Sequence, residues 1–380
     1  MRATLALEDG RLFRGMSFGA SDTTFGEVVF HTGMTGYQEV ISDPSYRGQI
    51  VAMTAPLIGN YGVNPEDNES HRLHLSGFVV REYCDTPSNW RSSESLGALL
   101  AQHGIPGITG IDTRALTRHI RTAGALRGGI GVGVEDADLL EKVKGSPGLF
   151  GRDLVAEVRA TAPYDWEEPL APEWVVQSHA APGPLHARVA VLDCGVKFGI
   201  LRRLRQKVTD VKVFPAGTPA PEILEWAPDG VLLSNGPGDP TAVEGVVATV
   251  RDLMGNLPIF GICLGHQVLA LALGATTYKL KFGHHGANHP VKNLLTGDIE
   301  ITSQNHGFAV DEDSLLATGA EVTRRNLNDG TIEGFRHREL DIQALQYHPE
   351  ACPGPNDAAG IFDDFARRVG RRAAIATGDA

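Results

Sequence analysis

The rhythm of hydrophobic and polar residues changes about half way along the chain. After residue 187, short apolar runs alternate with helix-like segments: residues 188–193 (RVAVLD), 211–214 and 230–233 (GVLL) have the pattern of strands, and 199–207 that of a helix. Short apolar runs bounded by turn residues are typical of strands buried on both faces. Strands that alternate with helices predict a mainly parallel sheet covered by helices on both faces.

The first part of the chain has a different pattern. Residues 4–7 and 28–30 have the pattern of short strands broken by glycines, and residues 93–103 that of a helix capped by Ser92 or Ser93. This predicts a mixed α/β domain at the N-terminus, followed by the mainly parallel-sheet domain.

Chain length and proline content suggest where the domains divide. A chain of 380 residues exceeds what one hydrophobic core usually holds. The stretch 161–187 is rich in proline, which disfavours helices and central strands. We therefore expect an N-terminal domain over residues 1–150, a linker over 151–187 and a second domain over 188–380.

Composition excludes several classes of function. There are 34 basic and 46 acidic residues, a formal net charge of −12, and no run of Lys or Arg stands out. Nucleic-acid surfaces need clustered positive charge, so we expect no nucleic-acid partner. The four cysteines lie far apart and form no C-x-x-C pair. This disfavours a disulfide framework and a four-cysteine zinc site, and it favours a reducing cytoplasm.

One apolar stretch is about long enough to cross a membrane. Residues 257–277 carry His266 and Gln267 near their middle, with glycines at 261, 265 and 274. A buried strand, a tight turn and a buried helix explain the stretch better, so we expect no membrane partner. The N-terminus shows no apolar segment typical of a signal peptide.

The same stretch contains a candidate nucleophile. In PIFGICLGHQ (258–267), Cys263 stands in a G-x-C-x-G turn between a strand and a helix, like the serine of a G-x-S-x-G elbow. A cysteine at a helix N-terminus favours the thiolate, and the N–H of Leu264 is placed to stabilise an oxyanion. A buried structural cysteine is the alternative.

A candidate base lies near the end of another apolar run. In LQYHPE (345–350), alternation along an extended chain would place His348 beside Glu350. The carboxylate would then orient the imidazole, and the two would complete a nucleophile, base and orienter triad with Cys263. A lone histidine near a strand end is otherwise an ordinary surface or core residue.

Two glycine-bearing loops offer polar backbone groups to a ligand. SNGPGDP (234–240) follows a predicted strand, and QNHGF (304–308) lies closer to the candidate histidine. Ordinary turns have the same composition, so a purely structural role is the alternative.

At these residues the sequence resembles the class I (triad) glutamine amidotransferases. GICLGHQ, NGPGDP and HPE are landmarks of that family and occur in its order, over roughly residues 188–370. Three further blocks resemble the small subunit of carbamoyl-phosphate synthase: HTGMTGYQEVISDPSYRGQIV (31–51), GIPGITGIDTRALTRHIR (104–121) and KFGHHGANHPV (281–291). With them the resemblance spans nearly the whole chain.

The resemblance implies a role for each matching position. Cys263 would be the nucleophile, His348 the general base and acid, and Glu350 its orienter. The implied glutamine contacts are Ser45, Gly236, Gly238, Leu264, Gln267, Asn305, Gly307 and Phe308.

The implied activity is the hydrolysis of glutamine through a Cys263 thioester. The ammonia would pass to a large subunit, which makes carbamoyl phosphate from bicarbonate and ATP for arginine and pyrimidine biosynthesis. No G-x-x-x-x-G-K-[ST] loop is present, so we expect no cofactor in this chain, with ATP and Mg used by the large subunit in a hetero-oligomer.

Other functions remain open. The second domain alone is compatible with the glutaminase of another synthase or a free-standing γ-glutamyl hydrolase, although residues 31–121 argue against both. A scaffold that has lost its chemistry is opposed by the intact triad. A metal site of His284, His285 and His289 is less favoured than a structural loop, so we expect no metal.

Overall fold

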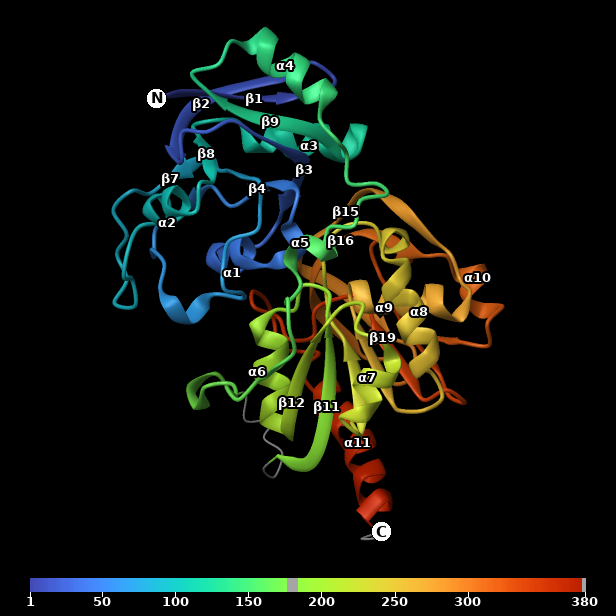
Figure 1. Cartoon of the computed structure of the whole chain (residues 1–380). Helices are drawn as coiled ribbons and strands as arrows, with labels where there is room; N and C mark the ends of the chain where they lie inside the picture. Colours follow the sequence, from blue (N-terminus) through green and yellow to red (C-terminus); the bar gives the residue numbers. More distant parts are fainter. Residues whose placement is uncertain (176–183, 378–380) are drawn as a thin grey trace. The chain divides into compact units, whose positions relative to one another are not determined.

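The computed structural model describes residues 1–175 and 184–377, and its chain contacts divide them into two compact units (Figure 1). Unit 1 comprises Met1–Leu154 and Leu280–Gly286, and unit 2 comprises Val155–Lys279 and Ala287–Ala380. Residues 176–183, inside the predicted linker, lie outside the described residues.

Unit 1 is built around a closed barrel with strand order β1-β2-β8-β6-β4-β3-β9. Apolar side chains of the strands fill the interior. The elements of unit 1 are β1 (Arg2–Leu7), β2 (Leu12–Gly19), β3 (Thr24–His31), α1 (Tyr37–Ser42), η1 (Pro44–Tyr46), β4 (Gln49–Met53), β5 (Leu57–Ile58), η2 (Pro65–Asp67), β6 (Gly77–Val79), β7 (Glu82–Tyr83), α2 (Leu96–Gln102), β8 (Pro106–Thr109), α3 (Thr113–Ala123), β9 (Leu126–Val132) and α4 (Asp136–Gly145).

Helix α2 begins later than its sequence pattern predicts. Its N-cap is Ser95, whose side chain accepts a hydrogen bond from the N–H of Ala98. The prediction of a cap at Ser92 or Ser93 was therefore wrong. Ser93 instead donates its hydroxyl to the carbonyl of Val63, which keeps it in the preceding loop. Several serines in a row are equally good cap candidates, and only tertiary contacts select one.

A short piece of chain from the second half of the sequence completes unit 1. The N–H of Ala125 donates to the carbonyl of Lys281 at 2.8 Å. The ring of Phe282 stacks on that of Phe30 with a centroid distance of 5.9 Å. Strand β15 (Thr277–Asn293) thus leaves unit 2, contributes Leu280–Gly286 to unit 1 and returns.

Unit 2 is built on a ten-stranded sheet of order β10-β12-β11-β13-β14-β19-β18-β17-β15-β16. The elements of unit 2 other than β15 are α5 (Val155–Val158), β10 (Tyr164–Asp165), η3 (Pro172–Trp174), β11 (Leu185–Asp193), α6 (Phe198–Lys207), β12 (Val208–Pro215), α7 (Ala220–Glu225), β13 (Gly230–Leu233), η5 (Pro240–Ala242), α8 (Glu244–Leu253), β14 (Ile259–Ile262), α9 (Leu264–Leu273), β16 (Ile299–Val310), α10 (Glu312–Leu316), β17 (Glu321–Asn326), β18 (Ile332–His337), β19 (Ile342–Leu345) and α11 (Ile361–Thr377).

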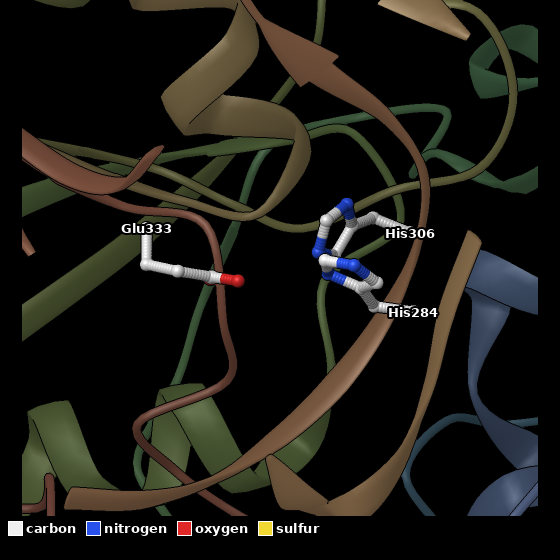
Figure 2. Close-up of side chains that lie close together, drawn as sticks. All are labelled: His284, His306 and Glu333. Carbon is white, nitrogen blue, oxygen red and sulfur yellow. The ribbon is translucent and has the colours of Figure 1, made fainter. Parts of the chain in front are cut away.

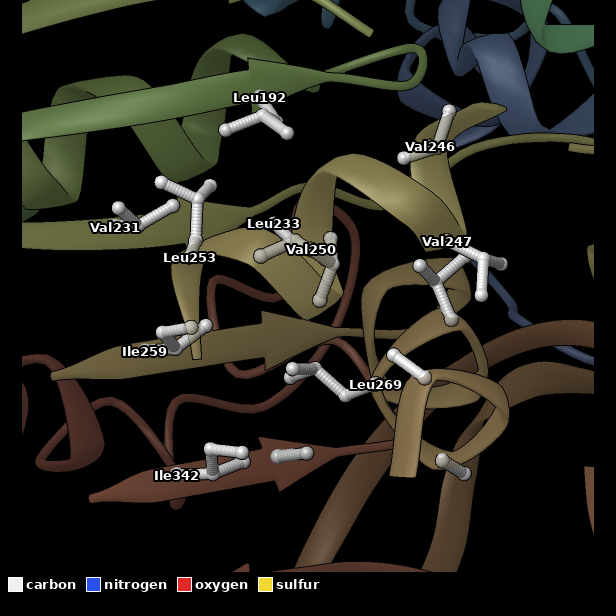
Figure 3. Packing of buried hydrophobic residues seen from close by; sticks show 14 of the residues in the cluster. Leu192, Val231, Leu233, Val246, Val247, Val250, Leu253, Ile259, Leu269 and Ile342 are labelled. Carbon is white, nitrogen blue, oxygen red and sulfur yellow. The ribbon is translucent and has the colours of Figure 1, made fainter. Parts of the chain in front are cut away.

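Strands β12, β11, β13, β14 and β19 are parallel neighbours, and both faces of this part of the sheet are covered. On one face, Val231 and Ile259 pack with Leu253 of α8 (Figure 3). On the other face, Phe260 packs with Phe362 of α11. Neighbouring residues of one strand therefore enter opposite cores, which explains why these strands are apolar throughout. The predicted α/β class is confirmed. The centre of the sheet is parallel as predicted, whereas β10, β17 and β18 pair antiparallel to their neighbours.

No helix among residues 1–175 and 184–377 is both long and apolar enough to cross a membrane. The apolar stretch 257–277 forms β14, a turn, α9 and the start of β15, as its glycines and polar residues predict. All four cysteines are free thiols.

Candidate active site

Three neighbouring strands deliver the candidate residues to one edge of the sheet. Leu233 at the end of β13 is in register with Gly261 of β14, and Ile262 at the end of β14 is in register with Leu345 at the end of β19. Because the strands are parallel, the segments that follow their carboxyl ends lie side by side. Segments 234–240, 263–267 and 346–350 meet in this way.

Cys263 occupies a strained position between β14 and α9. Its φ is 53° and its ψ is −103°, which few residues other than glycine adopt, and its side chain is buried. The flanking glycines allow α9 to pack this closely on the strands. A Cβ at Gly265 would lie 2.4 Å from the carbonyl oxygen of Leu233, and one at Gly261 would lie 2.5 Å from Leu269.

The first turn of α9 leaves one donor next to the thiol. The N–H groups of His266 and Gln267 donate to the carbonyl of Cys263, and that of Gly265 donates to Ser234. The N–H of Leu264 has no hydrogen-bond partner among the described residues. At a helix N-terminus such a donor favours negative charge on a nearby oxygen. The geometry thus supports the oxyanion donor expected from the sequence.

The Cys263 sulfur contacts a backbone carbonyl and a side-chain amide. Sγ lies 3.5 Å from the carbonyl oxygen of Asn305, to which the thiol donates. The side-chain Nε2 of Gln346 lies 3.8 Å from Sγ and donates to it. Gln346 is fully buried, and its importance is not evident from the sequence motif.

His348 and Glu350 lie side by side, as the sequence predicts. Nδ1 of His348 is 2.7 Å from Oε1 of Glu350, and both side chains are buried. The backbone reason differs from the prediction. Strand β19 ends at Leu345, and residues 348–351 form a turn in which the N–H of Ala351 donates to the carbonyl of His348. The two side chains meet across this turn rather than along a strand.

The second nitrogen of His348 is free to act on a neighbouring group. Because Nδ1 donates to the carboxylate, the remaining chemistry lies at Nε2, which has no hydrogen-bond partner among the described residues. Burial acts to lower the pKa of His348, but the negative charges of Glu350 and Cys263 outweigh burial and raise it to about 10. The site therefore favours the imidazolium form of His348.

Two cations that the sequence analysis missed hold Glu350 in place. Nζ of Lys197 lies 3.0 Å from Oε1 of Glu350 and donates to the carbonyl of Ala351 at 2.7 Å. Nε of Arg203 donates to the carbonyl of Glu350 at 3.0 Å. Burial acts to raise the pKa of Glu350, but Lys197 and His348 lower it to about 2, so the carboxylate stays ionised. Lys197 is the N-cap residue of α6 and Arg203 lies within that helix, and neither belongs to a motif that the sequence singles out.

The structure brings most of the expected glutamine contacts of unit 2 together. Gln267 donates from Nε2 to the carbonyl of Phe308 at 2.9 Å, and the carbonyl of Asn305 faces the thiol. A Cβ at Gly236 would meet Leu264 at 2.8 Å and the carbonyl of Cys194 at 2.2 Å, so close packing requires glycine there.

For three of the expected glutamine contacts, the structure shows the local backbone and packing. Gly238 lies in the same loop as Gly236 with a φ of 88°, which favours glycine. A Cβ at Gly307 would meet no atom within 4 Å, so packing does not require glycine there. Ser45 belongs to unit 1, where it is buried and its N–H donates to Asp43 at 2.8 Å. Its contact with glutamine stays a prediction.

Near the triad, buried polar residues form a hydrogen-bonded chain within unit 2. Nε2 of His306 is 2.9 Å from Oε1 of Gln304, whose Nε2 donates to Glu333 at 3.0 Å. Nδ1 of His306 faces the carbonyl of Phe308 at 2.7 Å, so both ring nitrogens are engaged. Figure 2 draws His306 and Glu333 together with His284, which is grouped with unit 1. We assign no metal to these residues.

Comparison with known proteins agrees with this geometry. Residues 5–130 match the family model for the carbamoyl-phosphate synthase small chain, CPSase domain, and residues 190–368 match the model for class-I glutamine amidotransferase. The chain is 54% identical to a carbamoyl phosphate synthase small chain of Syntrophotalea carbinolica, over 96% of this chain and 97% of the relative. It is 53% identical to proteins of the same name in Thermosynechococcus vestitus (97% and 96% covered) and a Nostoc species (97% and 95% covered). The chain therefore belongs to the carbamoyl phosphate synthase small chain family and carries a class-I glutamine amidotransferase domain.

Proposed function

We propose that this chain is the glutaminase subunit of a glutamine-dependent carbamoyl-phosphate synthase. The observation that carries the proposal is the buried arrangement of Cys263, His348 and Glu350 at the edge of the parallel sheet. A thiol, an imidazole and a carboxylate in this order supply a nucleophile, an acid-base group and its orienter. Family membership identifies glutamine as the substrate class.

The first half-reaction forms a thioester. The Cys263 thiolate attacks the side-chain amide carbon of glutamine, so a carbon–sulfur bond forms and the carbonyl oxygen becomes an oxyanion. The N–H of Leu264 stabilises that oxyanion. When the carbon–nitrogen bond breaks, His348 gives the proton on Nε2 to the leaving nitrogen, and ammonia departs.

The second half-reaction releases glutamate. Neutral His348 takes a proton from water while the water oxygen attacks the thioester carbon. The carbon–sulfur bond then breaks, which returns the Cys263 thiolate and the His348 imidazolium. The carboxyl group formed loses its proton to solvent. Glu350 keeps Nδ1 of His348 protonated throughout, so Nε2 carries every proton transfer.

Residues around the thiol would hold the substrate. The carbonyl of Asn305 contacts the sulfur, and Gln267 is hydrogen-bonded to Phe308 in one wall of the site. Gly236, Gly238, Gly307 and Ser45 are further proposed contacts. The open space at the Cα of Gly307 supports a close approach of the ligand to the backbone there.

Ammonia made at Cys263 would serve a partner chain. We propose that a large subunit binds this chain in a cytoplasmic hetero-oligomer and uses ATP, Mg and bicarbonate to make carbamoyl phosphate. This product supplies arginine and pyrimidine biosynthesis. In this scheme the chain itself needs no cofactor, because acyl transfer to a thiolate needs only acid-base groups.

Replacing the nucleophile tests the division of labour. In the complex, Cys263→Ser is expected to abolish synthesis of carbamoyl phosphate from glutamine and to leave synthesis from added ammonium intact. Cys84→Ser, which changes a free thiol of unit 1, is the matched control and should keep both activities. Loss of both activities in a folded, assembled Cys263→Ser complex would contradict the proposal. Ammonia release without any large-chain partner at full rate would instead favour a free-standing hydrolase.

A further inference from the structure

Gln346 lies beside the reacting sulfur, although the triad chemistry assigns it no role. It follows β19 directly, in the segment that also carries His348, and its side chain is fully buried. Its Nε2 lies 3.8 Å from Sγ of Cys263, and its backbone N–H donates to the carbonyl of Glu333 at 2.9 Å. The backbone is therefore fixed independently of the side chain.

A chain of amides determines which end of Gln346 faces the sulfur. The carbonyl oxygen of Phe308 can only accept, so the atom of Gln267 that lies 2.9 Å from it must be the NH2 group. The same NH2 group lies 3.0 Å from Gln346, which must therefore present its oxygen to Gln267. The remaining end of Gln346 is the NH2 group, and it points at Sγ.

We propose that Gln346 is a catalytic residue whose side-chain amide donates a hydrogen bond to the Cys263 sulfur and stabilises its thiolate form. The bond acts twice in the reaction, once before the sulfur attacks and once when the sulfur leaves the thioester. The inference rests on the proposed function, in which Cys263 is the nucleophile.

Chemistry supports a catalytic rather than a space-filling role. A thiol accepts hydrogen bonds weakly, whereas a charged acceptor makes stronger ones, so the amide gains most when the sulfur is ionised. If this position only had to fill space, leucine would serve equally well, because it has no polar atoms that need hydrogen-bond partners when buried. Gln267 connects the donor to Phe308 on β16, so the wall that would contact the substrate also aligns the donor.

Alkylation of Cys263 by iodoacetamide measures the thiolate directly. The full-length chain would be reacted over a range of pH, and the modified peptide would be quantified by mass spectrometry so that the other three cysteines do not interfere. In Gln346→Leu, the donor is lost while His348 and Glu350 keep their charges. The half-maximal pH of alkylation should move upward by about one unit, with about tenfold slower alkylation below it.

Gln346→Glu separates the donor from the volume of the side chain. Glutamate has the same shape and still accepts from Gln267, but it turns a carboxylate oxygen toward the sulfur. We expect a larger upward shift than in Gln346→Leu, and glutamine hydrolysis with a lower kcat and little change in KM. The matched control is Tyr347→Phe, which removes the hydrogen bond to Glu300 from the same segment without touching the sulfur.

The outcomes separate the possible failures. Unchanged alkylation profiles in folded Gln346→Leu and Gln346→Glu would overturn the inference. Equal shifts in Tyr347→Phe would overturn it too, because they would show a general loosening of residues 345–350. If the chain still hydrolyses glutamine after Cys263→Ser, the proposed function itself fails and not only this inference.

Discussion

The ammonium group of Lys197 and the carboxylate of Glu350 form a buried ion pair, with Nζ 3.0 Å from Oε1. The same carboxylate oxygen binds Nδ1 of His348 at 2.7 Å. Both partners of the pair are almost fully excluded from solvent, with side chains 3% and 0% exposed. One anion is thus shared by a fixed cation and the imidazole, and the position of His348 depends on both.

Removing the fixed cation should be costly. Lys197→Met keeps the length of the side chain but leaves Glu350 with less compensation, and breaking a buried pair typically destabilises by about 3–5 kcal/mol. We expect a loss of this size in the free energy of unfolding, measured by urea denaturation, together with a lower kcat for glutamine hydrolysis. Lys212→Met is the control. Nζ of Lys212 lies 3.9 Å from Oδ1 of Asp165, whose side chain is largely exposed, so this substitution should lower the free energy of unfolding by less than about 1 kcal/mol. Equal losses in the two variants would contradict this account.

The triad should make stability depend on pH in two windows. The folded pKa of Glu350 is lowered to about 2, so its contribution is complete above pH 4.5 and is lost as the pH falls toward 2. The folded pKa of His348 is raised to about 10, so its contribution is complete below pH 6.5 and is lost as the pH rises toward 10. The difference in the free energy of unfolding between the wild-type chain and the double variant His348→Gln, Glu350→Gln should therefore be largest between pH 4.5 and 6.5.

The variant Cys263→Ala tests whether the charge of Cys263 contributes to the loss of stability at alkaline pH. In Cys263→Ala the negative charge that helps to raise the pKa of His348 is absent. The decline above pH 6.5 should then end at a lower pH, with each group contributing a slope of at most about 1.4 kcal/mol per pH unit. An alkaline decline identical in the wild-type chain and Cys263→Ala would show that the thiolate does not act on His348.

The convergence of the motifs was predicted from their chemistry and from the family resemblance, and the strand order provides its structural basis. PIFGICLGHQ and LQYHPE each follow an apolar run, and β14 and β19 proved to be parallel neighbours. Lys197 and Arg203 were not predictable, since a lysine or arginine in sequence gives no sign that it is buried. Their importance arises because α6 packs where residues 350–351 turn, which is a tertiary contact.

The backbone at Cys263 should reverse an ordinary stability order. At most positions Ala→Gly destabilises by up to about 1 kcal/mol, because glycine loses more conformational freedom on folding. With φ at 53° the alanine side chain is strained, and that strain costs about 1–3 kcal/mol. We expect Cys263→Gly to be at least as stable as Cys263→Ala in denaturant unfolding.

Cys194 provides the comparison for that measurement. Like Cys263 it is buried and forms no disulfide, but it is not among the residues of positive φ. Cys194→Gly should therefore be less stable than Cys194→Ala. If the two cysteine positions rank alanine and glycine in the same order, the conformation at Cys263 carries no measurable strain.

Glycines of the site should divide into structural and ligand-facing positions. Gly307→Ala adds a methyl group where no atom lies within 4 Å, so we expect unchanged stability and a raised glutamine KM. Gly265→Ala places its methyl group 2.4 Å from the carbonyl oxygen of Leu233, so we expect a loss of about 1–3 kcal/mol from overpacking. Thermal unfolding and steady-state kinetics would separate the two. An unchanged KM in Gly307→Ala would place glutamine away from that residue.

Strand boundaries and caps were less predictable than the site. The run TLAL indicates a strand, but β1 begins at Arg2 and β3 extends from Thr24 to His31, because pairing within the barrel continues past the apolar core. The turn that brings His348 to Glu350 also has no clear pattern in sequence.

The course of β15 determines when unit 1 can complete its folding during synthesis. Residues 280–286 belong to unit 1, where Lys281 and His285 accept hydrogen bonds from Ala125 and Thr32, yet they are translated after residues 155–279. N-terminal domains generally fold while the rest of a chain is still being made. Here the nascent N-terminal unit lacks one of its own segments until most of the parallel sheet has left the ribosome. Unit 1 can therefore reach its final form only after the ribosome has passed the codons for Cys263 and helix α9.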